Sequence, residues 1–435
     1  MNLKKLVSAP YKRANRLFHP ADSIIVGNFV GSNALAAVGS SGSPIFLLIG
    51  FSQGIAVGAG VVVSQFLGAK DREGAHTAVH TSLALSAILG AILTVCGIAV
   101  SRALLTAMNT PAEVLEDAVL YMRLYFGGVL FSVVYNMAAG ILNAAGNSKR
   151  SLLYLGVASI TNIVLDLVLI AGCKMGVAGA AIATVLSQAV SAVWILRFLT
   201  GRKTILRLKA RNMLLQGKII LPCLALGISN FVMVSTESIL SVSFTSSLSR
   251  YGGDVAVGAM TVLTSVNQLI TMPLQGICQG GQPLISYNYG AKKLERVKEA
   301  FFCQFLVCVG YTTVFWLLVM AFPKVFAGIF TSDGALVDYT AWAIRIFLAG
   351  TFSVGFQVSC QLAFMALGQA KISLIMACLR KLILLIPLIF ILPNFFADKA
   401  FAVFLAEPVS DILAAAVTTI TFFTFFRKLL KAGKQ

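Results

Sequence analysis

Five acidic residues of this chain lie within or at the edge of long apolar stretches. They are Asp22, Asp166, Glu237, Glu407 and Asp411. A charge at the centre of a lipid bilayer costs roughly 2.5–3.5 kcal/mol or more, so acids in such places usually face a cavity, a partner or a bound ion. These five positions are therefore the first candidates for a functional site.

Asp166 stands in the stretch TNIVLDLVLI, and Asn162 lies four residues before it. Residues four apart share one face of a helix. A carboxylate and an amide oxygen on one face form a hard-oxygen site that suits a proton or a small cation. The pair predicts a cation-coupling site, and a polar hydrogen bond between two helices is the alternative.

Asp22 begins the segment DSIIVG, and Glu237 begins the similar segment ESILSV 215 residues later. A carboxylate that heads the equivalent helix of two related halves would face a central cleft from either side. We predict that Glu237 lines a substrate cavity, together with Gln53, Gln275 and Gln282. The carboxylate of Glu237 would attract cationic compounds. The alternative for Glu237 is a helix contact that satisfies its charge.

Glu407 and Asp411 are spaced four residues apart in LAEPVSDILAA, on one face of the last apolar stretch. Arg380 and Lys381 also lie inside an apolar stretch. We predict a buried charge network of Arg380, Glu407 and Asp411. Direct contact of the two acids with substrate is an alternative, and the two basic side chains have the further option of extending to the cytoplasmic membrane surface.

The elements that must position these residues are membrane helices. Of the 435 residues, 58% are hydrophobic and only 11% are charged, which is too apolar for a soluble globular protein. Stretches long enough to span a bilayer lie at 40–67, 77–101, 119–145, 152–173, 177–199, 219–249, 255–287, 301–328, 340–367, 372–393 and 400–426. They predict eleven helices, and a segment before residue 40 is expected to provide a twelfth.

The net charge of +18 is distributed over alternate connections between the predicted helices. Basic residues concentrate at 68–74, 146–150, 201–211, 290–298 and 427–435. This is the pattern of loops on the cytoplasmic side of a membrane, so both termini are predicted to be cytoplasmic. Because the charges are scattered and lack interleaved aromatic residues, no nucleic-acid partner is expected.

The sequence repeats itself at a distance of 222 residues. QGIAVGAGVVVSQFLGAK at 53–70 corresponds to QGICQGGQPLISYNYGAK at 275–292, and AAGNSKRSL at 144–152 corresponds to ALGQAKISL at 366–374. A register kept over a hundred residues indicates two homologous halves. Six helices per half, with basic loops at matching places, predict direct repeats related by a pseudo-two-fold axis along the membrane normal.

This repeat predicts four segments. Residues 1–200 form an N-terminal six-helix lobe and residues 219–426 a C-terminal six-helix lobe. Residues 201–218 form a basic cytoplasmic linker, and residues 427–435 a cytoplasmic tail. Two similar bundles around a central cleft suit alternating access better than a fixed pore.

Several stretches together resemble the multidrug and toxic compound extrusion (MATE) transporters, in particular their bacterial multidrug-efflux branch. The resemblance covers about residues 17–430. It is carried by DSIIVGNFVGSNALAAVG (22–39), GAGVVVSQFLGAKDRE (58–73), GILNAAGNSKRSL (140–152), NIVLDLVLI (162–170), GVAGAAIATVLSQ (176–188), MPLQGICQGGQPLISYNYGAK (272–292) and LAEPVSDILAA (405–415).

The resemblance implies twelve helices in two bundles and export of organic, often cationic, compounds driven by inward flow of Na⁺ or H⁺. It also implies a cation site in the first half, made by Asp22, Asn162, Asp166 and Thr184. The acid of the seventh helix matches Glu237, whereas the acid that some members carry in the tenth helix has no match within 340–367. No cofactor is implied, and no metal other than Na⁺.

The start of the chain departs from the family pattern. Relatives have an apolar stretch before the acid of the first helix, whereas MNLKKLVSAPYKRANRLFHPA carries five basic residues and two prolines. The first helix is therefore predicted to be truncated or altered, with Asp22 near the surface.

Three other classes of protein are the alternatives to a cation-coupled exporter. A flippase for lipid-linked sugars of a related fold is the nearest alternative, supported by Arg380 and Lys381. A major facilitator transporter would carry a characteristic basic loop that GAKDREGAH does not match. A membrane enzyme would depend on His76 and His80, which lack the pattern of a zinc site, so we predict that the chain is not an enzyme.

The sequence thus predicts a multi-pass protein of the bacterial inner membrane. Its expected partners are small organic cations and the lipid bilayer, and it is expected to be a monomer.

Overall fold

The computed structural model describes residues 32–108, 110–201, 215–331 and 333–432, together with residues 26, 30 and 208. Within these residues the chain forms helices and no β-strand. Most of the predicted altered first helix, including Asp22, lies outside the described residues, and its part from Ser32 onward belongs to the first long helix described below. The chain divides into two compact units, with the boundary between Phe231 and Val232.

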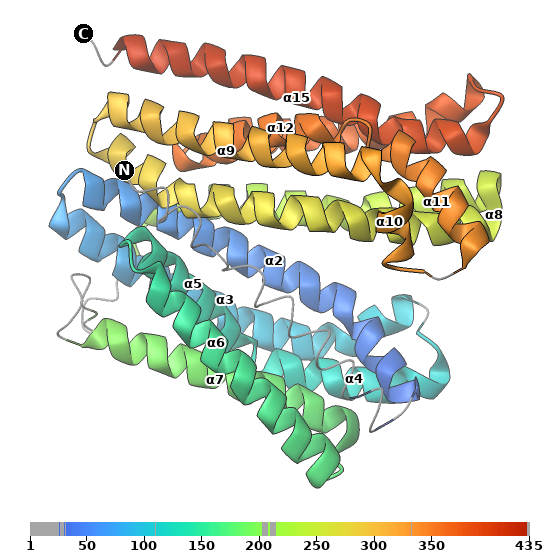
Figure 1. The fold of residues 1–435 in the computed structure, drawn as a ribbon. Helices are drawn as coiled ribbons and strands as arrows, with labels where there is room; N and C mark the ends of the chain where they lie inside the picture. Colours follow the sequence, from blue (N-terminus) through green and yellow to red (C-terminus); the bar gives the residue numbers. More distant parts are fainter. Residues whose placement is uncertain are drawn as a thin grey trace. The chain divides into compact units, whose positions relative to one another are not determined.

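Among its described residues, the N-terminal unit contains six α-helices, one short π-helix and the first part of α8 (Figure 1). The elements are α2 (Ser32–Gly68), α3 (Arg72–Ala107), α4 (Ala112–Gly127), α5 (Val129–Ala144), α6 (Ser148–Asp166), the π-helix η2 (Leu167–Gly172), α7 (Gly176–Thr200) and the start of α8 (Gly217–Gly290). Within the unit, α2 packs against α3, α4 and α5, and α6 packs against α7.

The C-terminal unit contains the rest of α8 and all later elements. These are α9 (Leu294–Ala321), α10 (Pro323–Gly328), α11 (Gly334–Phe347), the 3₁₀-helix η4 (Thr351–Ser353), α12 (Val354–Ala366), α13 (Ala370–Cys378), the π-helix η5 (Leu379–Leu385), α14 (Ile386–Ile391), the 3₁₀-helix η6 (Leu392–Asn394) and α15 (Lys399–Ala432). Helix α12 packs against both α9 and α15.

The described residues confirm the predicted membrane helices. Eight helices are long and apolar enough to cross a bilayer, and ten spans result if each of two bent helix pairs is one span. Helix α8 would be about 110 Å long if straight, which is far more than a bilayer. Its backbone leaves the helical conformation at Gly253 (φ 66°, ψ −164°), so α8 corresponds to the two predicted spans 219–249 and 255–287.

Three predicted spans are less regular than the sequence indicated. The spans 119–145 and 340–367 are bent pairs, α4 with α5 at 46° and α11 with α12 at 48°. The predicted span 301–328 was too long, because α9 ends at Ala321 and Pro323 begins the separate helix α10. Proline at the first position of a helix is favourable, whereas within a helix it removes a hydrogen bond.

The backbone repeats the 222-residue register of the sequence. Lys70 and Lys292 are equivalent, and both adopt the uncommon left-handed conformation, with φ of 58° and 55°. The equivalent Gly146 and Gly368 have φ of 76° and 75°. Because such conformations are rare and local, their recurrence at one spacing confirms that the two halves are direct repeats.

Equivalent glycines also stand at the two bends. A Cβ at Gly128 would lie 2.2 Å from Val185 Cγ1 of α7, and a Cβ at Gly350 would lie 2.7 Å from Pro408 Cα of α15. Val185 and Pro408 differ by 223 positions, one more than the two glycines. The close approach of one bend to α7 and of the other to α15 is therefore part of the repeat.

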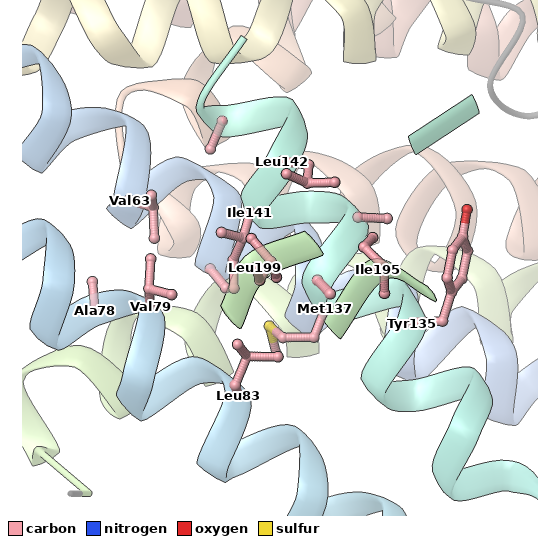
Figure 2. Packing of buried hydrophobic residues seen from close by; sticks show 14 of the residues in the cluster. Val63, Ala78, Val79, Leu83, Tyr135, Met137, Ile141, Leu142, Ile195 and Leu199 are labelled. Carbon is pink, nitrogen blue, oxygen red and sulfur yellow. The ribbon is translucent and has the colours of Figure 1, made fainter. Parts of the chain in front are cut away.

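Buried apolar side chains fill the interior of each unit separately. In the N-terminal unit, α3 supplies Ala78, Val79 and Leu83, which pack against side chains of α5 such as Met137 and Ile141 (Figure 2). The outward faces are apolar as well; on α3, for instance, Ile92 and Val95 are 51% and 69% exposed. Exposed apolar side chains on spanning helices are suited to contact with lipid.

The α2–α5 contact in this unit depends on Gly140, which has no side chain. A Cβ at Gly140 would lie only 2.6 Å from the backbone oxygen of Ala56, so α5 and α2 touch through their backbones, as at small-residue contacts in membrane helices. We expect Gly140→Ala to lower the free energy of unfolding by about 1–3 kcal/mol through overpacking. Thermal unfolding of the purified protein in detergent measures this effect.

Gly156 provides the matched control, because a Cβ at that position of α6 would meet no atom within 4 Å. Gly156→Ala should leave the melting temperature unchanged or raise it slightly, since alanine favours a helix by about 1 kcal/mol over glycine. Equal melting temperatures for the two variants would contradict the proposed close packing.

Candidate cation and substrate sites

The N-terminal unit brings two of the predicted cation-site residues into contact. Asn162 of α6 is fully buried, and Thr184 of α7 is 7% exposed. Asn162 Nδ2 donates a hydrogen bond to Thr184 Oγ1 (3.5 Å), and Thr184 Oγ1 donates one to the backbone oxygen of Ala180 (3.0 Å). The amide nitrogen of Asn162 is thus directed to α7. Its Oδ1 is buried without a hydrogen-bond partner among the described residues.

Asp166 lies one turn after Asn162 on the same face of α6, and it is fully buried. It is the last residue of α6, because the π-helix η2 begins at Leu167. Short π-helical segments widen a helix by one residue per turn and occur frequently at functional sites. The carboxylate therefore stands where the regular α-helix of this span ends.

A further polar residue near this position was not among the predicted site residues. Gln188 lies one turn after Thr184 on α7, and its Nε2 donates a hydrogen bond to Tyr125 Oη at 3.5 Å. Its Oε1 is buried and has no hydrogen-bond partner in the described part of the chain. The sequence did indicate Gln188, because Thr184 and Gln188 are the positions of the first half that correspond to Glu407 and Asp411 of the second half.

The C-terminal unit pairs Arg380 with the two acids of α15. Arg380 Nη1 lies 3.2 Å from Asp411 Oδ1, and Arg380 Nη2 lies 3.9 Å from Glu407 Oε1. The side chains are 14%, 5% and 8% exposed, respectively, for Arg380, Asp411 and Glu407. Arg380 Nη1 also donates a hydrogen bond to Gln357 Oε1 at 3.3 Å. Two buried carboxylates therefore share one guanidinium.

Lys381, the next residue, reaches a different acid. Its ammonium contacts Glu237 Oε1 and donates a hydrogen bond to the backbone oxygen of Met233 at 3.0 Å. Arg380 and Lys381 both lie in the π-helix η5, and the backbone oxygen of Arg380 accepts a hydrogen bond from Ser410 Oγ (2.8 Å). Both basic side chains are thus engaged inside the unit.

The four predicted cavity residues are placed as follows. Glu237 is exposed, with 59% of its side chain accessible, and belongs to the C-terminal unit with Gln275 and Gln282. Gln275 is half-buried, and Gln282 is 6% exposed, with an Nε2 that has no hydrogen-bond partner among described residues. Gln53 is half-buried on α2 of the N-terminal unit. Their contribution to a shared substrate cavity stays a prediction.

Comparison with known proteins gives the same family for most of the chain. The sequence profile of the MatE family matches residues 17–168 and 229–391. The chain is 30% identical to the probable multidrug resistance protein YoeA of Bacillus subtilis over 284 residues, which are 63% of this chain and 60% of that protein. It is 23% identical to the multidrug export protein MepA of Staphylococcus saprophyticus over 89% of this chain and 86% of MepA.

Solved structures agree with these sequence matches. A crystal structure of MATE in the bent conformation matches with a TM-score of 0.93 at 25% identity, and covers 99% of this chain and 95% of that one. An outward-facing structure of a multidrug resistance MATE family transporter matches with a TM-score of 0.88 at 25% identity, over 96% and 93% of the two chains. This chain is a multi-pass membrane protein of the MatE family, whose members are transporters rather than enzymes.

Proposed function

We propose that this chain is an antiporter that exports organic, often cationic, compounds and is driven by an opposing flow of Na⁺ or H⁺. The observation that carries the proposal is the buried group of oxygen atoms on α6 and α7 of the N-terminal unit. Asn162, Asp166 and Thr184 contribute an amide, a carboxylate and a hydroxyl within two neighbouring spanning helices.

A small cation fits this group better than an anion does. Carboxylate, amide and hydroxyl oxygens are the ligands that hard cations prefer. A buried carboxylate is costly in its charged form, and a proton or a bound Na⁺ would neutralise it. Gln188 Oε1 is a further buried acceptor near the same part of α7. We include Asp22, which lies outside the described residues, as the fourth proposed ligand.

Drug-like organic compounds are the proposed substrates. The relatives named multidrug export protein and multidrug resistance protein support this class. Glu237 is the proposed site of attraction for their positive charge, because its carboxylate is exposed on a helix of the C-terminal unit.

The flippase alternative loses its main support in the C-terminal unit. A flippase for lipid-linked sugars would use basic side chains in its cavity to hold a pyrophosphate. Arg380 and Lys381 were the residues that favoured it, and both are paired with carboxylates. The names of the relatives also favour the exporter.

We further propose that the chain acts as a monomer in the bacterial cell membrane, with both termini in the cytoplasm. The distribution of basic residues supports this orientation, and both relatives come from bacteria.

Transport in proteoliposomes tests the proposal. Ethidium efflux is measured with a pH gradient alone, with a Na⁺ gradient alone and with neither, while K⁺ and valinomycin hold the membrane potential at zero. We expect one of the two gradients to raise the initial rate at least about fivefold. Liposomes without protein are the control. Equal rates in all three conditions would contradict a coupled antiporter.

A further inference from the structure

We infer that Lys381 is a tethered counter-ion of Glu237, which organic cations must displace to bind, and that it thereby limits the affinity of this site for positively charged substrates. The inference rests on the proposed function, because it concerns the same exposed carboxylate. It adds a residue that determines specificity.

The two partners differ strongly in accessibility. The Lys381 side chain is 9% exposed, whereas the Glu237 side chain is 59% exposed. The ammonium thus approaches the carboxylate from inside the unit and is held there by the backbone oxygen of Met233 at 3.0 Å. A ligand has access to the carboxylate without access to the lysine. A cationic ligand that binds the Glu237 carboxylate therefore competes with Lys381, which is always present.

Glu237 begins an exposed polar stripe on α8. Ser241, Thr245 and Ser249 follow at intervals of four residues, and all three are exposed. Residues at this spacing lie along one side of a helix. Ionisable and polar residues in membrane spans usually face a protein cavity or water rather than lipid. The stripe therefore indicates a hydrated path beside Glu237.

An apolar side chain borders this stripe. Val242 of the same helix is 70% exposed, and it stands three residues before Thr245, a spacing that makes the two side chains neighbours on the helix surface. An organic cation needs a negative group for its charge and an apolar surface for its body. Glu237 and Val242, which lie within two turns of α8, supply the negative group and an apolar side chain beside the polar stripe. Metal ions and other small inorganic cations would gain nothing from the apolar side chain.

When a substrate binds Glu237, the positive charge of Lys381 loses this partner, and other acids of the same unit are available to compensate it. Removing one partner of a buried ion pair is costly if the other charge stays uncompensated. Here Glu407 and Asp411 share the single guanidinium of Arg380, so this group of three carries one excess negative charge when all are ionised. Lys381 follows Arg380 directly in η5, so this acidic group stands beside the segment that carries Lys381. The inference includes an exchange of partners between these groups.

The first half of the repeat has no equivalent lysine. At the 222-residue offset, Ser159 stands in place of Lys381 and Ala158 in place of Arg380. The N-terminal unit therefore carries its buried carboxylate without a neighbouring basic residue at these positions. The C-terminal unit instead contains the basic side chains of Arg380 and Lys381. These compete with a bound cation for the carboxylates of the unit.

Equilibrium binding to the full-length protein in detergent tests the inference. Ethidium serves as a permanently cationic probe, and Nile red as a neutral apolar probe. We expect Lys381→Met to lower the Kd for ethidium by about tenfold and to change the Kd for Nile red by less than about twofold. Lys324→Met, which removes an exposed lysine of α10, is the matched control and should leave both values unchanged.

Two further variants keep the test decisive. Lys381→Gln keeps a hydrogen-bond donor for Met233 and should reproduce the tighter ethidium binding if Lys381→Met does not fold. In a Glu237→Gln background, removing the lysine should no longer strengthen ethidium binding, because the carboxylate that it blocks is absent.

The inference is wrong if both lysine variants bind ethidium as the wild type does, or if the two probes shift by the same factor. These outcomes are separate from failure of the proposed function. Wild-type protein that exports ethidium under a gradient, with lysine variants of unchanged affinity, would overturn the inference alone. Absence of ethidium binding in every variant would overturn both.

Discussion

Replacing Asp166 with asparagine is expected to reduce gradient-driven export of ethidium by at least about tenfold, as losses of 10- to 100-fold are typical when a metal site loses a supporting group. Asparagine has nearly the same shape, so packing at the end of α6 should be preserved. It removes the negative charge that would attract a proton or Na⁺ to the buried oxygen atoms of Asn162 and Thr184. Initial efflux rates in proteoliposomes at equal protein content measure the loss.

Asp117→Asn is the matched control, because Asp117 is an exposed acid on α4 of the same unit. Export by this variant should equal that of the wild type. Melting temperatures of both variants in detergent establish that they are folded. Undiminished export by a folded Asp166→Asn protein would remove Asp166 from the coupling mechanism and leave its burial to a structural role.

The second large effect is expected for stability, at the buried pair of Arg380 and Asp411. Asp411→Ala would leave the guanidinium, which is 14% exposed, with Glu407 at 3.9 Å and the Gln357 side chain at 3.3 Å. Breaking a buried ion pair by removing one partner typically costs about 3–5 kcal/mol. We expect a loss of about 3 kcal/mol, since Glu407 retains part of the compensation. Thermal unfolding in detergent is the measurement.

An exposed pair in the same unit is the control. Lys324 and Asp338 lie 2.7 Å apart, and their side chains are 71% and 66% exposed. Asp338→Ala should cost no more than about 1 kcal/mol, as exposed pairs do. Combining Arg380→Met with Asp411→Leu and Glu407→Gln should recover much of the stability, because none of the three buried charges is then left without its partner. Equal losses for Asp411→Ala and Asp338→Ala would contradict the argument.

The number and repetition of the helices could be predicted from the sequence, because both depend on local composition. Apolar stretches of membrane length predicted the spans, and the 222-residue repeat predicted two related halves. The recurrence of positive φ at Lys70 and Lys292, and at Gly146 and Gly368, confirms that register in the backbone. Helix ends were less accurate, since helices continue into charged connections that a search for apolar stretches leaves out.

Irregularities within the spans were not predicted. The bends of 46° and 48° and the π-helices η2 and η5 all lie inside the predicted spans. A π-helix differs from an α-helix only by one residue in its hydrogen bonds, and hydropathy does not record that difference. Gly128 and Gly350 stand at the two bends, where Val185 and Pro408 of distant helices leave no room for a Cβ.

For the candidate sites, too, the sequence predicted relations along one helix but not contacts between distant helices. Asn162 and Asp166 could be placed on one face because helical spacing is a property of the chain itself. Thr184 entered only through the family resemblance, and Gln188 was not included. The pairing of Lys381 with Glu237 was also not predicted, since the residues are 144 positions apart.

The sequence by itself determined that this protein lies in a membrane, that it contains two related halves and which few charges lie within its apolar stretches. Composition, spacing and repetition are sufficient for these conclusions. Only the tertiary structure decided which charge meets which: Arg380 with Asp411 and Glu407, and Lys381 with Glu237. Such pairs depend on distances between helices that are remote in sequence, and differences of a few ångströms determine whether two charges in a low-dielectric interior compensate each other.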